Sequence, residues 1–173
     1  MPLTPFHLGP GLFLGSLSSK FLNLWAILFG SIVIDIEPMV LLIVNPCYHC
    51  PHHGFFHSIL GAIFGSLILS AILWKFKERL NQISLRFKIS QSFSFKNLYF
   101  SSLIAWLIHI FLDNLCHFDV YPFWPSHFKP FYVGPEIYWP LNLILLILGI
   151  FGLIFLIKKI KKYAGYQIHS PKP

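Results

Sequence analysis

Histidine and aspartate residues stand inside or at the edges of long apolar runs in this sequence. His109 and Asp113 are four residues apart within one run, so they lie on one face of the predicted helix. His53 and His57 have the same spacing at the start of another apolar run. Because ionised groups are costly in hydrocarbon, residues of these types face the protein interior and have partners there.

These residue types are also the ones that bind divalent metals. Imidazole nitrogens and carboxylate oxygens are ligands for zinc, and for manganese or iron. Gly54 permits a bend that brings His52 towards His57. Asp35 ends a third apolar run, and His7 begins a fourth. A catalytic zinc keeps an open position for water and lowers the pKa of that water to about 7, so the pattern indicates a metal-dependent hydrolase.

Two other interpretations of these residues stay open. A His–Asp pair inside a helix bundle can be satisfied by hydrogen bonding alone, in a structural membrane protein without a site. Intramembrane Asp and His also form relays, so the alternative function is a transporter that handles protons or metal ions. Transporters usually show paired repeats and sites at the midplane, and we find neither here. The loop residues His49, His117 and His127 are expected to have no role.

The composition identifies an integral membrane protein. The chain is 55% hydrophobic and 11% charged, and its mean hydropathy is +0.67. Apolar runs of about 20 residues match the roughly 30 Å hydrocarbon core of a bilayer. We therefore predict an all-α, polytopic helix bundle with about four spans plus short re-entrant or interfacial helices. The predicted spans are Phe55–Trp74, Asn97–Leu115, Tyr138–Ile157 and, as a shorter one, Phe21–Ile34.

Several smaller features refine this topology. Gly61 and Gly65 form a G-x-x-x-G face, which lets a neighbouring helix approach closely. Pro38 disfavours helical geometry at Glu37, so we expect a helix to break there. Leu8–Leu17 is too short to span and suits a short helix within the bundle. We expect loops at Asn45–His53 and His117–Ile137.

The formal charge of +7 is concentrated beside the spans. Basic residues fill Lys75–Lys96 between two spans and follow the last span at Lys158–Lys162. This is typical of cytoplasmic flanks, and no basic stripe is interleaved with exposed aromatics, so we expect no nucleic-acid partner. We divide the chain into a membrane-embedded helical domain at 1–157 and a basic cytoplasmic tail at 158–173.

The same orientation brings the ionisable residues together. With both basic segments in the cytoplasm, four separate segments carry their His, Asp and Glu residues to the extracytoplasmic end of the bundle. The Ile, Phe and Lys usage fits an AT-rich prokaryote, so we expect a prokaryotic plasma membrane. At that end Cys47 and Cys50 could form a disulfide or remain two thiols.

The order of these motifs resembles that of the YdjM-like family, described as membrane-bound metal-dependent hydrolases and distantly similar to zinc-dependent phospholipase C. The resemblance covers about residues 1–130. The motifs are His7, Asp35-Ile36-Glu37, His52-His53-Gly54-Phe55-Phe56-His57-Ser58, His109-x-x-x-Asp113 and Pro122-Phe123-Trp124-Pro125. The family commonly has H-R-G-x-T-H-S in the third motif, so His53 stands where that motif has Arg.

The resemblance implies a set of site residues. It gives metal roles to His7, Asp35, His52, His57, His109 and Asp113. Six ligands exceed the protein complement of one zinc, so we expect a divalent metal, zinc before manganese or iron, with two or more ions. His53 or Glu37 is expected to assist proton transfer. The expected partners are membrane lipids, and the expected substrate is a phosphoester in a lipid or another membrane-proximal molecule.

Overall fold

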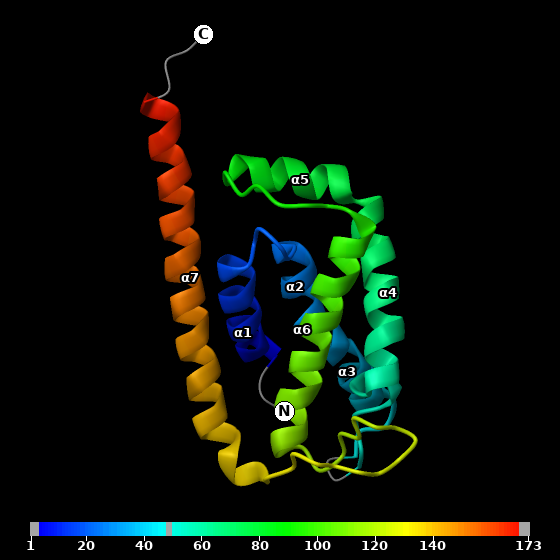
Figure 1. Ribbon diagram of the computed structural model, residues 1–173. Coiled ribbons are helices and arrows are strands. Elements are labelled where there is room, and N and C mark those ends of the chain that lie inside the picture. Colours follow the sequence, from blue (N-terminus) through cyan, green and yellow to red (C-terminus); the bar gives the residue numbers. More distant parts are fainter. Residues whose placement is uncertain (1–3, 48–49, 170–173) are drawn as a thin grey trace.

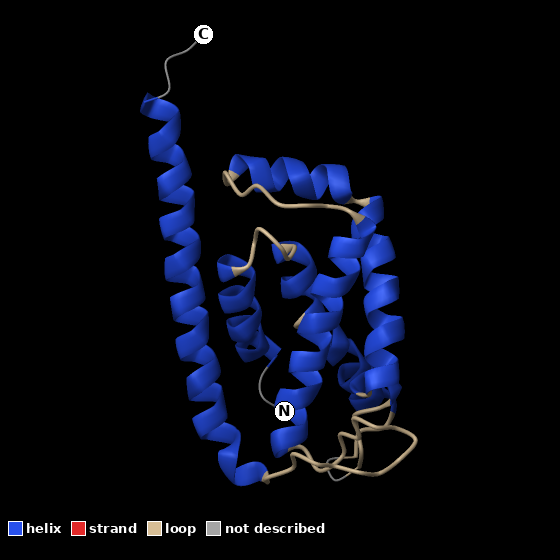
Figure 2. Cartoon of the chain, viewed as in Figure 1, coloured by secondary structure: helices blue, strands red, loops and turns tan. Residues whose placement is uncertain are grey.

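The computed structural model describes residues 4–47 and 50–169, and within these ranges all regular structure is helical (Figures 1 and 2). The longer helices are α1 (Thr4–Leu17), α2 (Leu24–Gly30), α3 (Ile36–Val44), α4 (Ile59–Lys75), α5 (Lys77–Arg86), α6 (Phe95–Cys116) and α7 (Tyr138–His169). Three 3₁₀ turns join them: η1 (Val33–Asp35), η2 (Phe55–His57) and η3 (Pro135–Ile137). The predicted all-α class is confirmed.

Helix α6 lies at the centre of the bundle, packed against α2 and α4, while α1 lies between α2 and α7 (Figure 1). Three stretches are long and apolar enough to cross a membrane: Leu24–Val44, Phe95–Cys116 and Pro135–Lys161. The pair α4 and α5, bent by 73°, makes a fourth if it is counted as one span. This agrees with about four predicted spans, and α1 is the short helix within the bundle.

The break in the first long apolar run was predicted at the wrong place. Helix α2 ends at Gly30, and a 3₁₀ turn follows before α3 begins at Ile36. Pro38 lies in the first turn of α3, where the backbone N–H that proline lacks would have no helical partner. Proline therefore starts this helix instead of ending one, and the irregular backbone falls between Gly30 and Ile36.

Helix α4 begins later than predicted because Ser58 caps it. The Ser58 hydroxyl accepts a hydrogen bond from the Gly61 N–H at 3.0 Å, which is the usual N-cap interaction. The residues Phe55–His57, predicted as the start of the span, form the 3₁₀ turn η2 instead. This turn directs His57 into the bundle, where it is fully buried.

The two glycines of the predicted G-x-x-x-G face have different neighbours. A Cβ on Gly65 would lie 2.4 Å from the Trp106 ring on α6, so this glycine allows the close approach of α4 and α6. A Cβ on Gly61 would lie 2.1 Å from the Phe55 carbonyl oxygen, so this glycine makes room for η2. Trp106 also donates its indole N–H to the Phe56 carbonyl at 2.9 Å, which ties α6 to the same turn.

Polar residues of the connector hold the start of α2. The Trp25 indole N–H donates to the Ser84 hydroxyl of α5 at 2.7 Å, and the Leu24 N–H donates to the Gln91 side-chain oxygen at 2.8 Å. Lys75–Lys96 was predicted as a basic connector, and it contains the helix α5, which lies across one end of the bundle (Figure 1). The end of α7 lies on the same side, so both basic segments share one end of the molecule.

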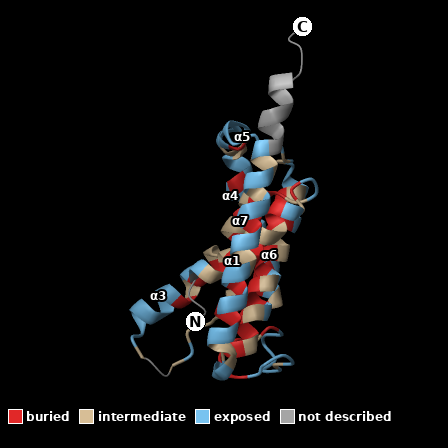
Figure 3. Ribbon diagram, turned by 90° about the vertical axis from the view of Figure 1, so that its left-hand side faces the viewer, coloured by how far each residue is buried: buried red, intermediate tan, exposed pale blue. Residues whose placement is uncertain are grey.

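The outer faces of the bundle are apolar. Figure 3 shows long exposed stripes on α7 and a projecting α3, whose residues Met39–Val44 are all at least 37% exposed. Exposed apolar area of this extent is typical of a surface covered by lipid. Helix α7 continues to His169, past Ile157 where the predicted span ends.

Cys47 and Cys50 form a disulfide, the first of the two alternatives left open by the sequence. Cys116, at the end of α6, is buried and free.

The contact between α1 and α7 predicts a large effect at Gly9. A Cβ there would lie 2.0 Å from the Leu145 carbonyl oxygen, a backbone atom that cannot move without moving α7. We expect Gly9→Ala to lower the free energy of unfolding by about 1–3 kcal/mol, as overpacked sites do, measured by thermal unfolding in detergent. Gly149→Ala is the matched control, because its nearest atom would be the Gly9 Cα at 3.2 Å. Equal stability of the two variants would contradict this account.

Candidate metal centre

Three elements bring buried metal-binding side chains together near one end of the bundle. Asp35, His57, His109 and Asp113 each offer a ligand atom, and these atoms all lie within 4.8 Å of one another. Asp35 comes from η1, His57 from η2, and the other two from the C-terminal half of α6. The predicted convergence of separate segments is therefore present in the structure.

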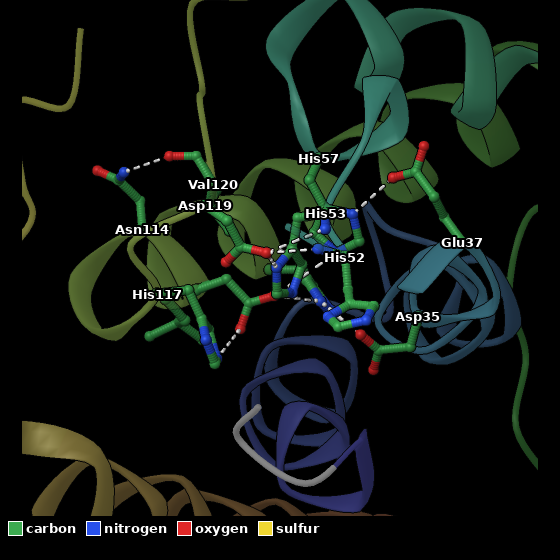
Figure 4. A network of polar contacts seen from close by, with 12 residues as sticks. Asp35, Glu37, His52, His53, His57, Asn114, His117, Asp119 and Val120 are labelled. Carbon is green, nitrogen blue, oxygen red and sulfur yellow. Dashed lines mark hydrogen bonds and ion pairs between the residues drawn. The ribbon is translucent and has the colours of Figure 1, made fainter. Parts of the chain in front are cut away.

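Asp113 is the centre of this group. It is 1% exposed and is approached by ring nitrogens from several segments, including the His53, His57 and His117 rings labelled in Figure 4. The distances from Asp113 oxygens to Nε2 are 3.0 Å for His109, 3.3 Å for His7, 3.6 Å for His57, 3.8 Å for His117 and 4.0 Å for His53. One buried anion thus faces five imidazole rings.

The other ring nitrogen of two of these histidines fixes their tautomers. His109 Nδ1 lies 2.8 Å from the Ser31 carbonyl oxygen, which can only accept, so Nδ1 carries the hydrogen. His57 Nδ1 likewise lies 2.8 Å from Glu37 Oε2. In a neutral imidazole the Nε2 atom then has only a lone pair, and both lone pairs lie against the Asp113 carboxylate. Two acceptors in contact repel each other unless a proton or a metal cation lies between them.

Hydrogen bonding alone does not satisfy this group. In residues 4–47 and 50–169, several buried atoms have no hydrogen-bond partner of acceptable geometry. They include Nε2 of His7, His52, His53, His57, His109 and His117, Asp35 Oδ2 and Asp113 Oδ1. Buried polar groups are normally paired. Nitrogen and carboxylate donors that converge without partners are the arrangement that a divalent cation requires, so the residues present fit a bound metal.

Glu37 holds the turn that carries His57. Its carboxylate accepts the backbone N–H of Gly54 at 3.1 Å and of Phe56 at 3.0 Å, in addition to the His57 ring. A Cβ on Gly54 would lie 2.7 Å from Glu37 Oε1, so glycine is needed for this approach. Both oxygens of Glu37 are therefore engaged by N–H groups, which suits a positioning role. The proton-transfer role expected for Glu37 stays a prediction.

His7 lies against His109. The two rings stack with centroids 3.9 Å apart and an angle of 19°, and His7 Nε2 points to Asp113 Oδ1. His52 is placed differently, since its backbone N–H donates to Asp119 Oδ2 at 2.8 Å. Its ring belongs to none of the clusters of metal-binding groups found in the described residues. Of the predicted ligands, His7 and His52 thus lie outside these clusters, although His7 Nε2 is 3.3 Å from Asp113 Oδ1.

His117 and Asp119 join the site from the loop after α6, although the sequence analysis gave neither a role. Asp119 Oδ2 lies 2.9 Å from His53 Nδ1 and also accepts the His53 backbone N–H at 3.2 Å. Burial would raise the pKa of Asp119, but the contact with His53 and the two backbone N–H groups hold it below its usual range. His117 follows Asp113 by four residues, the spacing of His109 and Asp113, so this signal could have identified it.

Burial favours the neutral form of two histidines outside the spans, His57 and His117. It lowers the pKa of His117 to about 4 and lowers the pKa of His57 below its usual value. A neutral ring is the form that binds a metal, because the ligand atom must have a free lone pair. Both residues are therefore available as ligands at pH 7.

The sequence model of the YdjM inner membrane protein family matches residues 3–168, nearly the whole chain. The uncharacterized protein YfhP of Bacillus subtilis (strain 168) is 33% identical over 88 residues, which are 51% of this chain and 23% of that protein. The chain therefore spans about a quarter of the length of this relative. No solved structure shows a significant match. The chain belongs to the YdjM inner membrane protein family; the similarity to zinc-dependent phospholipase C stays a prediction.

The contacts of Glu37 generate a test. Groups that hydrogen-bond to a metal-binding histidine and so orient it typically contribute a factor of about 10–100 to metal affinity. We expect Glu37→Ala to weaken divalent metal binding by that factor, measured by zinc titration of detergent-solubilised protein. Glu78→Ala, which removes an exposed carboxylate from α5, is the matched control and should leave the affinity unchanged. Unaltered affinity in Glu37→Ala would show that Glu37 does not support the metal ligands.

Proposed function

We propose that this member of the YdjM family is a membrane-embedded, metal-dependent hydrolase that cleaves a phosphoester in a lipid or another membrane-proximal substrate. One observation carries the proposal: buried histidine nitrogens and carboxylates from four segments converge without hydrogen-bond partners. Buried ionisable groups at membrane depth are costly, so such a cluster indicates a functional site.

Asp35, His57, His109 and Asp113 would hold the ion, with His7 beside them. Two nitrogens and two oxygens suit zinc, with manganese or iron as alternatives. When bound, such an ion stabilises negative charge on a phosphoryl oxygen and makes water a nucleophile near neutral pH.

The chain itself supplies orientation and exclusion of water. The Ser31 carbonyl and Glu37 fix the rings of His109 and His57 with their Nε2 atoms directed at Asp113. The Ser31 carbonyl is free to do this because α2 ends at Gly30, and the next N–H groups bond elsewhere: that of Asp35 donates to the Ile32 carbonyl. All four candidate ligands are at most 3% exposed. The ion and the reacting atoms would therefore lie in a site of low dielectric constant, where charges interact strongly.

A groove of about 630 Å³ beside this cluster supports a lipid substrate. It runs between α3 and α4, and its walls are apolar except at Glu37 and Gly54. Glu37 is also hydrogen-bonded to the candidate ligand His57, so the polar end of the groove adjoins the candidate metal site. Because both walls belong to membrane-spanning segments, the groove opens at hydrocarbon depth. An acyl chain of the substrate fits such a surface.

The charge distribution supports an extracytoplasmic position for the site. Helix α5 and the end of α7 carry the basic segments at one end of the bundle, opposite the loop that follows α6 (Figure 1). Basic flanks are usually cytoplasmic. The cluster would then face the outer side of the membrane, as would the disulfide between Cys47 and Cys50.

The first test is elemental analysis of detergent-purified protein beside His57→Ala and Asp113→Ala. We expect stoichiometric zinc, manganese or iron in the wild type and its loss in both variants, together with loss of phosphodiester hydrolysis. His127→Ala is the control, because His127 is an exposed loop histidine outside the clusters. If both variants kept the metal and the activity, the assignment would be wrong.

The groove gives a second test of the lipid substrate. Ile68 lines it on α4, whereas Leu67 is similarly exposed on the same helix but does not line it. Each acyl-chain methylene buried in the groove contributes about 0.8 kcal/mol to binding. A bulkier side chain that displaces two methylenes should therefore lower kcat/KM about tenfold. We expect Ile68→Trp to do this for a long-chain phospholipid but not for a soluble phosphodiester, and Leu67→Trp to affect neither. Equal effects on both substrates in Ile68→Trp would exclude an acyl chain in this groove.

A further inference from the structure

A second group of metal-binding side chains lies beside the first, at the end of α6. His53, His117 and Asp119 each offer one ligand atom within 4.8 Å of the others. They come from two loops: His53 precedes α4, and the other two follow α6. The rings of His53 and His117 have centroids 4.9 Å apart. Figure 4 shows these three side chains beside Asp35 and His57 of the first group.

The side chains of this group are largely shielded from solvent, and histidine nitrogens within it lack hydrogen-bond partners. The side chains of His53 and Asp119 are 4% and 6% exposed, and that of His117 is 13% exposed. In the described part of the chain, Nε2 of His53 and Nε2 of His117 have no hydrogen-bond partner. Two unpartnered imidazoles beside a carboxylate are the donor set of a zinc site with three protein ligands.

Asp113 connects the two groups through its two oxygens. Oδ2 is the oxygen nearest His109 and His57, at 3.0 and 3.6 Å. Oδ1 lies 3.8 Å from His117 Nε2 and 3.3 Å from His7 Nε2, and it has no hydrogen-bond partner among residues 4–47 and 50–169, while His53 Nε2 lies 4.0 Å from Oδ2. Histidines of both groups therefore approach this carboxylate, and a carboxylate with two oxygens can be shared by two cations.

We propose that His53, His117 and Asp119 bind a second divalent cation, zinc by ligand type, which shares Asp113 with the first. This rests on the first metal cluster of the proposed function and makes His53 a ligand instead of a proton donor. Adjacent pairs of divalent ions stabilise both the attacking and the leaving oxygen in phosphoester cleavage. A second cation is therefore consistent with the phosphoester substrate of the proposed function.

The other account of the same contacts is that Asp119 only orients His53 towards a single ion. The two accounts differ in stoichiometry. If Asp119 and His117 are ligands, their loss removes one ion and leaves the other. If Asp119 is an orienting group, its loss weakens the single site and the number of sites is unchanged.

The test counts ions in the full-length protein in detergent. Protein stripped with a chelator is reloaded with zinc, and the bound metal is measured by elemental analysis and by calorimetric titration. We expect two ions in the wild type and one in His117→Ala and in Asp119→Asn. The side-chain oxygen of asparagine can still accept the backbone N–H groups of His52 and His53, so this variant keeps the loop contacts. His127→Ala should keep both ions, and helical circular dichroism checks the fold of every variant.

The outcomes separate this proposal from the proposed function. One ion in the wild type, lost in His57→Ala but kept in Asp119→Asn, would overturn the second site and leave the first intact. Two ions retained in both His117→Ala and Asp119→Asn would also overturn it, because the second ion would then have other ligands. Absence of bound metal in folded wild type would overturn both.

Discussion

The approach of histidine ring nitrogens to the buried carboxylate of Asp113 is the contact on which the other features depend. An unpaired anion at this depth is costly, and removing a partner from a buried charge typically costs about 3–5 kcal/mol. The structure gathers five Nε2 atoms around Asp113 from α1, α6, the segment before α4 and the loop after α6. In their neutral form, the rings whose Nδ1 atoms are held by Ser31 and Glu37 present lone pairs instead of hydrogens to Asp113. A cation resolves this electrostatic conflict, and the supporting contacts then become the means of orienting its ligands.

Irregular backbone supplies much of this support. In hydrocarbon, backbone groups outside helices are tolerated only where protein covers them or a cavity surrounds them. The break after Gly30 leaves the Ser31 carbonyl free for His109 and places Asp35 beside it. The turn η2 places the His57 ring within hydrogen-bonding distance of Glu37. The Glu37 carboxylate also accepts hydrogen bonds from the backbone N–H groups of Gly54 and Phe56. The helices are thus interrupted where polar side chains can form hydrogen bonds with the backbone groups that the interruptions leave free.

The sequence predicted the spans and the convergence of ionisable residues because both follow from periodicity and from the cost of burying charge. His109 and Asp113 were found by their i, i+4 spacing. Asp119 could not be found in this way, since its partner His53 lies 66 residues away and the contact depends on how two loops fold against each other. The position of the helix break was missed for another reason. The prediction treated Pro38 as the end of a helix, and nothing in the apolar run indicated that a new helix would begin just before it.

Helix α7 carries none of the candidate ligands, and the sequence analysis treated its run as a span without charge, yet it determines where His7 lies. At 14 residues, α1 is about 21 Å long, too short to cross the hydrocarbon core, so its depth must be set by a neighbour. Glycines provide that contact from both sides. A Cβ on Gly9 would meet the Leu145 backbone at 2.0 Å, and one on Gly152 would meet the Phe13 backbone nitrogen at 2.5 Å. The backbones of α1 and α7 can therefore approach this closely only in one alignment along their length. That alignment places α1 at the depth where His7 reaches Asp113. An apolar span thus contributes to the site by packing alone.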